Sequence, residues 1–196
     1  MPTIATNSSI LVRGGGVPLM PLGDVLFMKA GASISAGNIS DLLTETQAVS
    51  CYGGNGIRGY VSNANQETDA VLVGRQGALC GNVQFAVAPF YATEHAVVIR
   101  PKGEMNLRYL YHALAFADLS QYKTSGAQPG LSVKRLKRVQ IPVPSLEEQE
   151  HIVSILDKFD TLVNNISQGL PAEIEARRKQ YEYYRDKLLT FKEKAA

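Results

Sequence analysis

The feature that most constrains the fold of this chain is a repeat of apolar residues near its C-terminal end. The steps between these residues alternate between four and three, which gives a seam with a seven-residue period. The members of the seam are Ile152, Leu156, Phe159, Val163, Ile166 and Leu170. This spacing is typical of a helix whose apolar stripe packs against another helix. Ser145 and Glu148 precede the seam as a capping box, so we predict a helix that begins at about residue 146.

A second apolar set continues the pattern, and its members are Ile174, Tyr181, Tyr184 and Leu188. Gly169 and Pro171 lie where an additional step of four shifts the register between the two sets. Because proline lacks a backbone donor and clashes with the carbonyl four residues earlier, we expect a kink or a break at 168–172. One bent helix and two shorter helices both satisfy the pattern. We predict that both sets line the seam of a homodimer; packing on the chain's own domain is the alternative.

The composition changes sharply at IPVPS, residues 141–145. Sixteen of the 17 glycines precede this point, and the charge balance is +4 before it and −2 after it. We therefore predict a domain of residues 1–144 and a helical arm of residues 145–196. No apolar run approaches the roughly 18 residues of a membrane span. The N-terminus does not resemble a signal peptide, so we expect a cytoplasmic protein without a membrane partner.

The first part of the chain contains short segments of alternating or β-branched residues, separated by glycine, asparagine and proline. These predicted strands are DVLFMKAG, TQAVSCY, GIRGYV, DAVLVGR, GNVQFAV and EHAVVIRP. The segment NLRYLYHALAF instead has helical spacing, and KRLKRVQIPVP is interpreted as a basic turn and a final strand. Cys51 and Cys80 lack metal-ligand spacing and are interpreted as core thiols. The predicted fold class is α+β, with a mixed or antiparallel sheet and a short helix before the helical arm.

The stretch CYGGNGIRGYV contains Gly54, Gly56 and Gly59 at the spacing of a dinucleotide-binding turn. That function requires a helix that begins within the motif, and an acidic residue about twenty positions later. The motif is followed instead by a short strand and a polar turn, and Asp69 comes too early. We interpret the glycines as a tight turn with positive φ, which Asn55 also tolerates. Such a turn allows the backbone to approach a ligand closely.

Searches for catalytic motifs find none. The chain contains no phosphate-binding loop, no amino-methyltransferase motif and no nuclease motif. His95, His112 and His151 are scattered, and His95, which follows Glu94 at a strand edge, is interpreted as structural. We predict no catalytic residue and no metal site, and therefore expect that the chain is not an enzyme.

Basic residues remain as the candidate functional feature. Four cations in five residues, at 134–138, directly precede the boundary, and glycine turns carry isolated polar residues. Such groups suit contacts with phosphates and base edges of DNA, although a solvated surface is the plain alternative for 134–138. The predicted DNA-binding residues are Gly53, Gly54, Asn55, Gly56, Arg58, Arg75, Gln76, Lys123, Gln128, Lys134, Arg135, Lys137 and Arg138.

The two parts of the chain resemble one known family. The segment IPVPSLEEQEHIVSILDKFDTLVNNI, followed by GLPAEIEARRKQYEYYRDKLLTF, resembles the helical region of the specificity subunits of type I restriction-modification systems. The first part is similar to their target recognition domains in PLGDVLFMKAGASIS, YGGNGIRGY, VGRQGALCGNV, ATEHAVVI and SGAQPGLSVKRLKRVQIPVPSLEEQ. The resemblance covers roughly residues 17 to 192, and residues 1–16 match nothing in this pattern.

The resemblance implies a non-catalytic subunit that recognises double-stranded DNA. The usual member carries two target recognition domains, each of which reads half of a split sequence through the major groove. Its helices form an antiparallel coiled coil. Modification subunits dock on this frame, bind S-adenosylmethionine and methylate a flipped adenine at N6. Restriction subunits add translocation and cleavage, so no cofactor is expected in this chain itself.

The chain departs from this pattern because it contains one recognition domain and one helical region. Two copies paired through their arms would rebuild the usual arrangement around a two-fold axis. This arrangement predicts a split palindromic target. The alternatives are a truncated or silent half-subunit that exchanges recognition domains with a full-length relative, a fragment, and a dimeric interaction scaffold that does not bind DNA.

Overall fold

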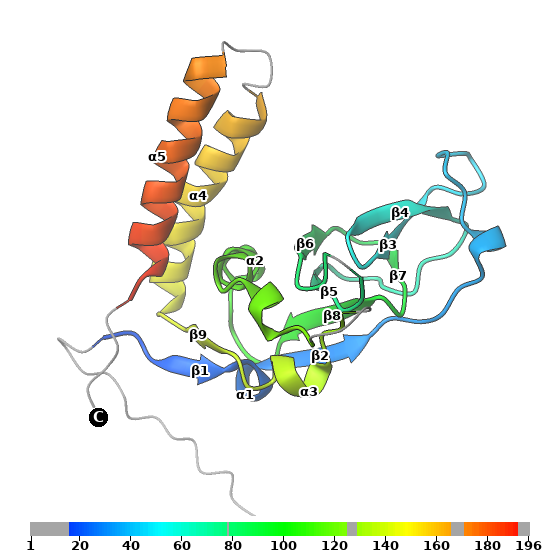
Figure 1. Ribbon diagram of the computed structural model, residues 1–196, viewed down its shortest axis with the longest axis horizontal. Helices are drawn as coiled ribbons and strands as arrows, with labels where there is room; N and C mark the ends of the chain where they lie inside the picture. The colour runs from blue at the N-terminus through cyan, green and yellow to red at the C-terminus, as the bar shows by residue number, and fades with distance from the viewer. Residues whose placement is uncertain (1–15, 78, 125–128, 166–170, 192–196) are drawn as a thin grey trace, which may run out of the picture.

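The computed structural model describes residues 16–77, 79–124, 129–165 and 171–191, with the side chains of 162–174 excepted. Figure 1 shows a β-rich domain from which two long helices project. The class is α+β, as predicted. Within the described ranges, no helix is both long enough and apolar enough to cross a membrane.

The larger sheet is antiparallel and has the strand order β2-β8-β5-β6. Its strands are β2 (Leu26–Ala30), β8 (Ala96–Pro101), β5 (Ala70–Gly74) and β6 (Val83–Ala86). Every residue of β5 is buried, and its sequence AVLVG contains no polar side chain. Because β-branched residues suit a pleated surface that is packed on both faces, this segment forms an interior strand of the sheet.

A smaller mixed sheet has the order β4-β3-β7, with β4 (Gly56–Val61), β3 (Val49–Gly53) and β7 (Phe90–Ala92). Strands β3 and β4 are antiparallel and are joined by a two-residue turn, whereas β3 and β7 are parallel. A third, antiparallel pair joins β1 (Leu19–Pro21) to β9 (Gln140–Pro142). This pair brings the start of the domain beside the beginning of the helices.

The six predicted strand segments overlap β2, β3, β4, β5, β6 and β8, and the predicted final strand is β9. The elements that were not predicted are β1 and β7, the short helices α1 (Leu22–Val25) and α3 (Val133–Leu136), and the 3-10 turns η1 (Ala36–Asn38) and η2 (Leu119–Tyr122). Each missed element has only three or four residues. A periodic pattern of apolar residues cannot be recognised in so short an element. For this reason α3, which overlaps the segment predicted as a basic turn, was not recognised as a helix.

Helix α2 (Leu107–Phe116) lies where a helix was predicted, between the sheet and the long helices (Figure 1). The side chain of Asn106 accepts hydrogen bonds from the backbone amides of Arg108 and Tyr109, which caps the N-terminus. Leu110 and Leu114 pack into the core of the larger sheet. One face of the larger sheet is thus covered by α2, and a second buried cluster, which includes Leu72, Val98 and Phe90, packs its other face against the smaller sheet.

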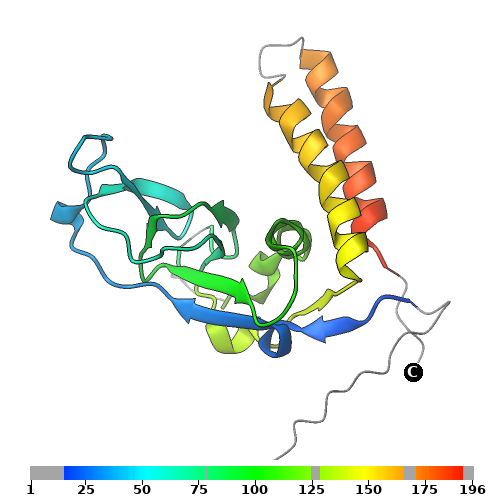
Figure 2. The same cartoon turned by 180° about the vertical axis from the view of Figure 1, so that it is seen from behind.

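The helical arm consists of two helices, α4 (Leu146–Asn165) and α5 (Pro171–Leu189). They lie side by side as a helical hairpin in both views (Figure 1, Figure 2). The structure thus decides between the two alternatives for 168–172 in favour of two helices. Pro171 is the first residue of α5, where a missing backbone donor has no cost. The amide of Glu148 donates to Ser145 Oγ at 3.3 Å, which supports the predicted N-terminal cap.

The structure corrects the predicted role of Ile152 and Leu156. Both side chains are 0% exposed within a single chain, where they pack with Tyr109 and Ala113 of α2 and with Leu189 of α5. They are therefore not available to a second copy. The seven-residue spacing specified a helical partner, and that partner belongs to the same chain.

Aromatic residues extend this packing along the hairpin. Phe159 stacks on Tyr184 with ring centroids 5.2 Å apart, and it meets Tyr181 edge-on at 6.4 Å. Leu188 packs against the same buried cluster as Leu189. These four predicted seam residues also face partners in their own chain. Ile166 and Leu170, and the side chains of Val163 and Ile174, lie outside the described part of the structure.

Candidate nucleic-acid interface

The predicted glycine turn lies at the centre of a surface that three segments build. The turn Gly54–Asn55 joins β3 to β4 and meets the loop after β5. A Cβ added to Gly74 would overlap the carbonyl oxygen of Gly54. A Cβ on Gly54 would lie 3.0 Å from the carbonyl oxygen of Gln76 and 3.4 Å from that of His95. Only residues without side chains allow the backbones to approach this closely.

The turn is tight, as the sequence predicted, but the positive φ lies at Gly56, directly after it, and not at Gly54 or Asn55. Gly56 has a φ of +97°, a value that glycine adopts readily. Asn55 holds the turn through its side chain, whose Oδ1 accepts a hydrogen bond of 2.7 Å from Asn82 Nδ2. No helix begins in the motif, because Gly56 and Gly59 both belong to β4. The glycines therefore serve a strand connection, as expected, and offer no helix N-terminus to a pyrophosphate.

An open hollow of about 420 Å³ lies beside this turn, lined by residues 53–58 and His95. The side chain of Arg58 is exposed at its edge. Burial raises the pKa of the Cys51 thiol, Arg58 opposes this shift, and Glu94 adds to it. Arg58 and Glu94 are thus both close enough to act on Cys51 electrostatically. The hollow combines an exposed cation, an amide and an imidazole, contributed by Arg58, Asn55 and His95.

The loop that carries Arg75 and Gln76 connects the turn to Lys123. The amide of Leu131 donates to the Arg75 carbonyl at 2.8 Å, and the amide of Thr124 donates to the Gly130 carbonyl at 2.9 Å. Lys123 and Asn55 line a second hollow of about 590 Å³. The structure therefore brings the turn, Arg75, Gln76 and Lys123 together on one surface. The predicted residue Gln128 lies outside the described residues.

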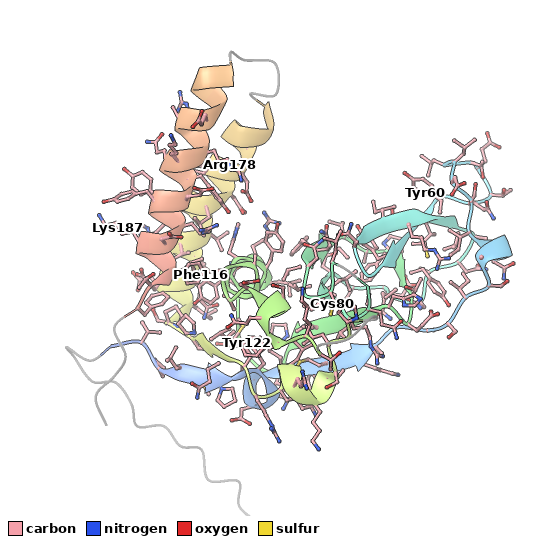
Figure 3. The ribbon with its side chains drawn as sticks, viewed as in Figure 1. Tyr60, Cys80, Phe116, Tyr122, Arg178 and Lys187 are labelled. Carbon is pink, nitrogen blue, oxygen red and sulfur yellow. The ribbon has the colours of Figure 1, made fainter. Side chains whose placement is uncertain are left out.

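The basic cluster forms a second group at α3. Lys134, Arg135, Lys137 and Arg138 are all exposed. Arg135 Nη1 donates to the carbonyl oxygen of Tyr122 at 3.2 Å, so α3 adjoins the segment that carries Lys123. Tyr122 is labelled in Figure 3, between the side chains of α2 and those of α3. The cations of α3 thus border the turn surface on the side of Lys123 and do not enter it.

Sequence reasoning missed the polar groups of the β7–β8 connection. Glu94 Oε1 and His95 Nε2 are 3.5 Å apart, and their side chains are 37% and 39% exposed. Glu94 Oε2, Thr93 Oγ1 and Arg75 Nε are buried atoms without a hydrogen-bond partner among the described residues. A buried polar atom that lacks a partner is costly, so these groups are candidates for ligand contacts. The adjacent Glu and His in ATEHAVVI were the available signal, and they were interpreted as structural.

Comparison with known proteins now identifies the family. The model of the type I restriction modification DNA specificity domain matches residues 18–176. The chain belongs to this family.

Relatives and solved structures agree with this membership. An Escherichia coli protein named as the EcoprrI type I restriction enzyme specificity subunit is 48% identical over 147 residues, which are 75% of this chain and 37% of that protein. A Haemophilus influenzae protein named as a type I restriction enzyme specificity subunit is 31% identical over 190 residues, 93% of this chain and 49% of that protein. The chain thus spans half or less of the length of these relatives.

Two crystal structures of S subunits share the fold at 18% identity. The subunit from M. genitalium has a TM-score of 0.69, and the matched region is 82% of this chain and 43% of that subunit. The HsdS subunit from Thermoanaerobacter tengcongensis has a TM-score of 0.60 and covers 94% of this chain with 47% of its own. At this identity the likeness shows the fold alone.

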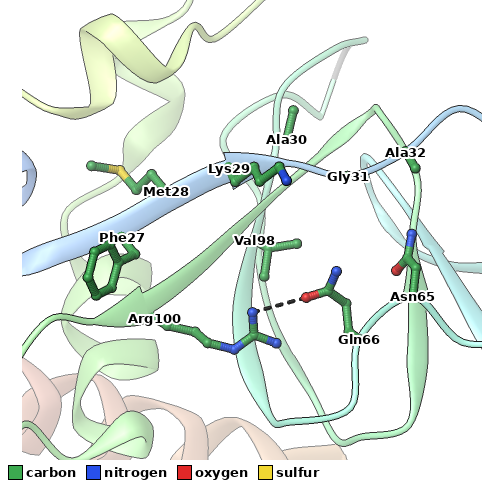
Figure 4. Close-up of a pocket in the computed structure, with 10 residues that line it drawn as sticks. All are labelled: Phe27, Met28, Lys29, Ala30, Gly31, Ala32, Asn65, Gln66, Val98 and Arg100. Atoms are coloured by element: carbon green, nitrogen blue, oxygen red, sulfur yellow. Dashed lines mark hydrogen bonds between the residues drawn. The ribbon is translucent and has the colours of Figure 1, made fainter.

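One further hollow of this specificity-domain chain lies apart from the predicted residues. It has a volume of about 520 Å³, and Figure 4 shows Arg100 and Lys29 among its lining residues. The guanidinium of Arg100 donates to Gln66 Oε1 at 3.0 Å and to the carbonyl oxygens of Thr68 and Asp69 at 2.7 and 3.2 Å. These three hydrogen bonds, one from each guanidinium nitrogen, hold β8 to the 66–69 loop.

A cluster of His112, Asp157 and Asp160 has ligand atoms close enough together for a metal ion. However, Arg108 Nη2 lies 2.7 Å from Asp157 Oδ1 and 3.9 Å from Asp160 Oδ2. A guanidinium therefore occupies the place of a cation. His112 Nε2 completes the network at 2.9 Å from Asp157 Oδ1. This cluster joins α2 to α4 and is an ion-pair network between the recognition domain and the arm.

The pKa values in this network follow from burial and charge. Burial lowers the pKa of His112 below its ordinary value, although the hydrogen bond with Asp157 and the nearby carboxylates oppose the shift. Burial alone would raise the pKa of Asp157, but the hydrogen bonds from Arg108 and His112 outweigh it and lower that pKa. A neutral His112 that donates from Nε2 to an ionised Asp157 satisfies both directions.

Proposed function

We propose that this chain is a DNA sequence-recognition subunit of a type I restriction-modification complex. The observation that carries the proposal is the convergence of three loops, represented by Asn55, Gln76 and His95, on one open polar surface. Polar groups on rigid turns suit the reading of base edges in the major groove. The exposed cations of Lys123 and α3 border this surface and suit phosphates, which fix orientation without reading sequence.

A homodimer is the second part of the proposal. One chain supplies one recognition domain and one helical hairpin, and it spans about half of the Haemophilus influenzae relative. Two chains related by a two-fold axis would present two identical surfaces in opposite orientations. The target would then be a split palindrome, with identical inverted halves.

The methylation step belongs to a partner. We propose that modification subunits dock on the dimer, bind S-adenosylmethionine and methylate an adenine at N6 in the sequence that this chain selects. In complexes that cleave DNA, a restriction subunit joins them. One of the solved relatives comes from a study of assembly and conformational transition of the type I system, which supports a role within a larger complex. This chain would select the DNA sequence, and the modification subunit would carry out the methylation.

The test is the methylation pattern of genomic DNA from cells that express this chain together with its modification subunit. N6-methyladenine in one split, palindromic motif is the expected result. A motif with unlike halves would mean that a different recognition domain takes part, and would overturn the homodimer. Cells that express the modification subunit alone are the control. If both strains show the same methylation, the recognition role fails.

A further inference from the structure

Glu94 and His95 lie in the connection between β7 and β8; His95 lines the hollow beside the glycine turn, and Glu94 precedes it in the chain with its carboxylate 3.5 Å from the His95 ring. The backbone fixes this position on two sides. The amide of Arg75 donates to the carbonyl oxygen of His95 at 2.9 Å, and the amide of Thr93 donates to the carbonyl oxygen of Tyr52 at 2.9 Å. The backbone on either side of Glu94 is thus hydrogen-bonded to the neighbouring segments, within a short connection between two strands.

The Glu94 carboxylate has unused acceptor capacity. Its Oε1 faces His95 Nε2 at 3.5 Å, a contact longer than an ordinary hydrogen bond. Its Oε2 has no donor at all among the described residues. Arg58 and Arg75 both lie in the neighbouring segments, yet neither forms an ion pair with Glu94 in the part of the chain that the structure describes. A carboxylate that forms no ion pair with nearby cations contributes little to stability, and its oxygens can accept hydrogen bonds from a ligand.

The chemistry of DNA limits what that donor can be. An ionised carboxylate only accepts hydrogen bonds, and phosphates, being anions themselves, repel it. In the major groove, base edges offer donors only at cytosine N4 and adenine N6. Adenine places the N7 acceptor beside N6, where it would face the second carboxylate oxygen, whereas cytosine has no acceptor on its own major-groove edge.

We propose that Glu94 is a specificity-determining residue that accepts a hydrogen bond from the N4 amino group of a cytosine in the target half-site. His95 is its positioning residue: Nε2 faces Oε1 at 3.5 Å, which leaves Oε2 for the base once the side chain turns outward. This inference rests on the proposed function. Glu94 contributes discrimination and not general affinity, because its charge opposes every non-cognate duplex.

The experiment is selection from a library of randomised DNA duplexes by the purified full-length chain, followed by sequencing. The wild-type chain should enrich a motif with a required cytosine. Glu94→Ala should make that one position degenerate, with a loss of discrimination of about tenfold or more, while the other positions stay unchanged. Binding to duplexes without the motif should become tighter, because a negative charge has been removed. His95→Ala should weaken discrimination at the same position only.

Glu94→Gln provides a second, directional test. An amide can accept from adenine N6 and donate to adenine N7, so this variant should shift the preference at the same position from cytosine to adenine. Glu104→Ala removes an exposed carboxylate elsewhere in the domain and should leave the motif unchanged. Thermal unfolding of each variant checks that it folds.

Three results would overturn the inference. In the first, Glu94→Ala retains the cytosine preference. In the second, Glu94→Ala loses all positions together with a lower unfolding temperature, which indicates a structural role. In the third, the wild-type motif contains no required cytosine. If the wild-type chain enriches no motif at all, the proposed function itself fails, and this outcome is distinct from the other three.

Discussion

At the scale of single residues, the proposed recognition surface depends on close contacts between backbone segments. Gly74 ends β5 directly below the glycine turn, and the carbonyl oxygen of Gly54 occupies the place where a Cβ would lie. Since both contacting groups belong to backbone, neither can rotate away as a side chain would. A methyl group at this position must move the turn or the strand.

We therefore expect Gly74→Ala to lower the free energy of unfolding by about 1–3 kcal/mol, the usual cost of overpacking. The same change should weaken sequence-specific DNA binding, because the turn moves with respect to Arg75. Denaturant unfolding and a binding titration measure the two effects. Gly103→Ala is the matched control, since a Cβ there meets nothing within 4 Å. Equal stability of the two variants would contradict the argument.

Variants of Arg58 and Lys137 should distinguish sequence-specific contacts from general electrostatic attraction to DNA. Arg58→Ala removes a cation beside the turn and should cost about 1–3 kcal/mol of affinity for the cognate sequence, with relaxed specificity. Lys137→Ala should weaken binding to all sequences and reduce the slope of log affinity against log salt by about one. Titrations at several salt concentrations, with cognate and random duplexes, measure both. The division of roles fails if both variants lose specificity equally.

The sequence predicted some of these residues and not others for a physical reason. The positive φ of Gly56, directly after the turn, was predictable because glycine is the residue that adopts such a φ readily. Glu94 and His95 were visible in the sequence as an adjacent pair, but the position of this pair near the turn was not. Their importance comes from the approach of β8 to the β3–β4 turn, a contact between segments about 40 positions apart that no local pattern encodes.

At the scale of elements, the arm shows what a seven-residue repeat can and cannot specify. The pattern predicted α4, its N-terminal cap and the interruption before Pro171, all of which depend on neighbours in sequence. It did not specify which helix covers the seam. In this chain α2 and α5 take that place, and the burial of Leu156 within one chain follows from their packing.

This packing predicts a large and concentration-independent effect. Leu156→Ala should lower the free energy of unfolding by about 2–5 kcal/mol, because the site is fully buried and can collapse only in part. Leu146→Ala, at a position that is 38% exposed on the same helix, should cost far less. Denaturant unfolding at several protein concentrations provides the test. A loss that disappears at high concentration would place Leu156 in an interface between chains instead.

The joint between α2 and α4 should make stability depend on pH. The pKa of His112 is lowered in the folded chain, so the unfolded chain binds more protons just below the ordinary value of 6.5. Stability is therefore complete above that value and declines as the pH falls from about 7 towards the folded pKa. His112→Gln should flatten this part of the curve. An unchanged pH dependence in the variant, measured by thermal unfolding between about pH 5.5 and 7.5, would exclude His112 as the source.

At the scale of the whole molecule, α2 joins the reading surface to the arm. One side of α2 packs on the sheet through Leu110 and Leu114, and the other meets α4 and α5 through Tyr109 and Ala113. The guanidinium of Arg185, on α5, lies over the ring of Phe116 (labelled in Figure 3), 5.7 Å from the ring centroid. A helix packed on both sides leaves the arm little freedom to swing. Two arms in a dimer would thus hold two reading surfaces at a fixed separation, as a split target requires.

A dimer must then form through side chains that are not already buried within the hairpin of α4 and α5 in one chain. Tyr183 is 60% exposed on α5, an unusual place for an aromatic ring, whereas Ile152 and Leu156 are inside. We expect the purified chain of 21.3 kDa to have about twice that mass in solution, and Tyr183→Glu to convert it to the monomer, because a charge would be buried against an apolar surface. Arg178→Glu places a carboxylate on another face of α5, at a side chain that is 73% exposed, and should leave the dimer intact. Light scattering measures the mass of the three proteins at equal concentration.

A wild-type monomer would show that this chain needs a different partner for its second half-site. A dimer unaffected by Tyr183→Glu would move the interface to another face of the hairpin.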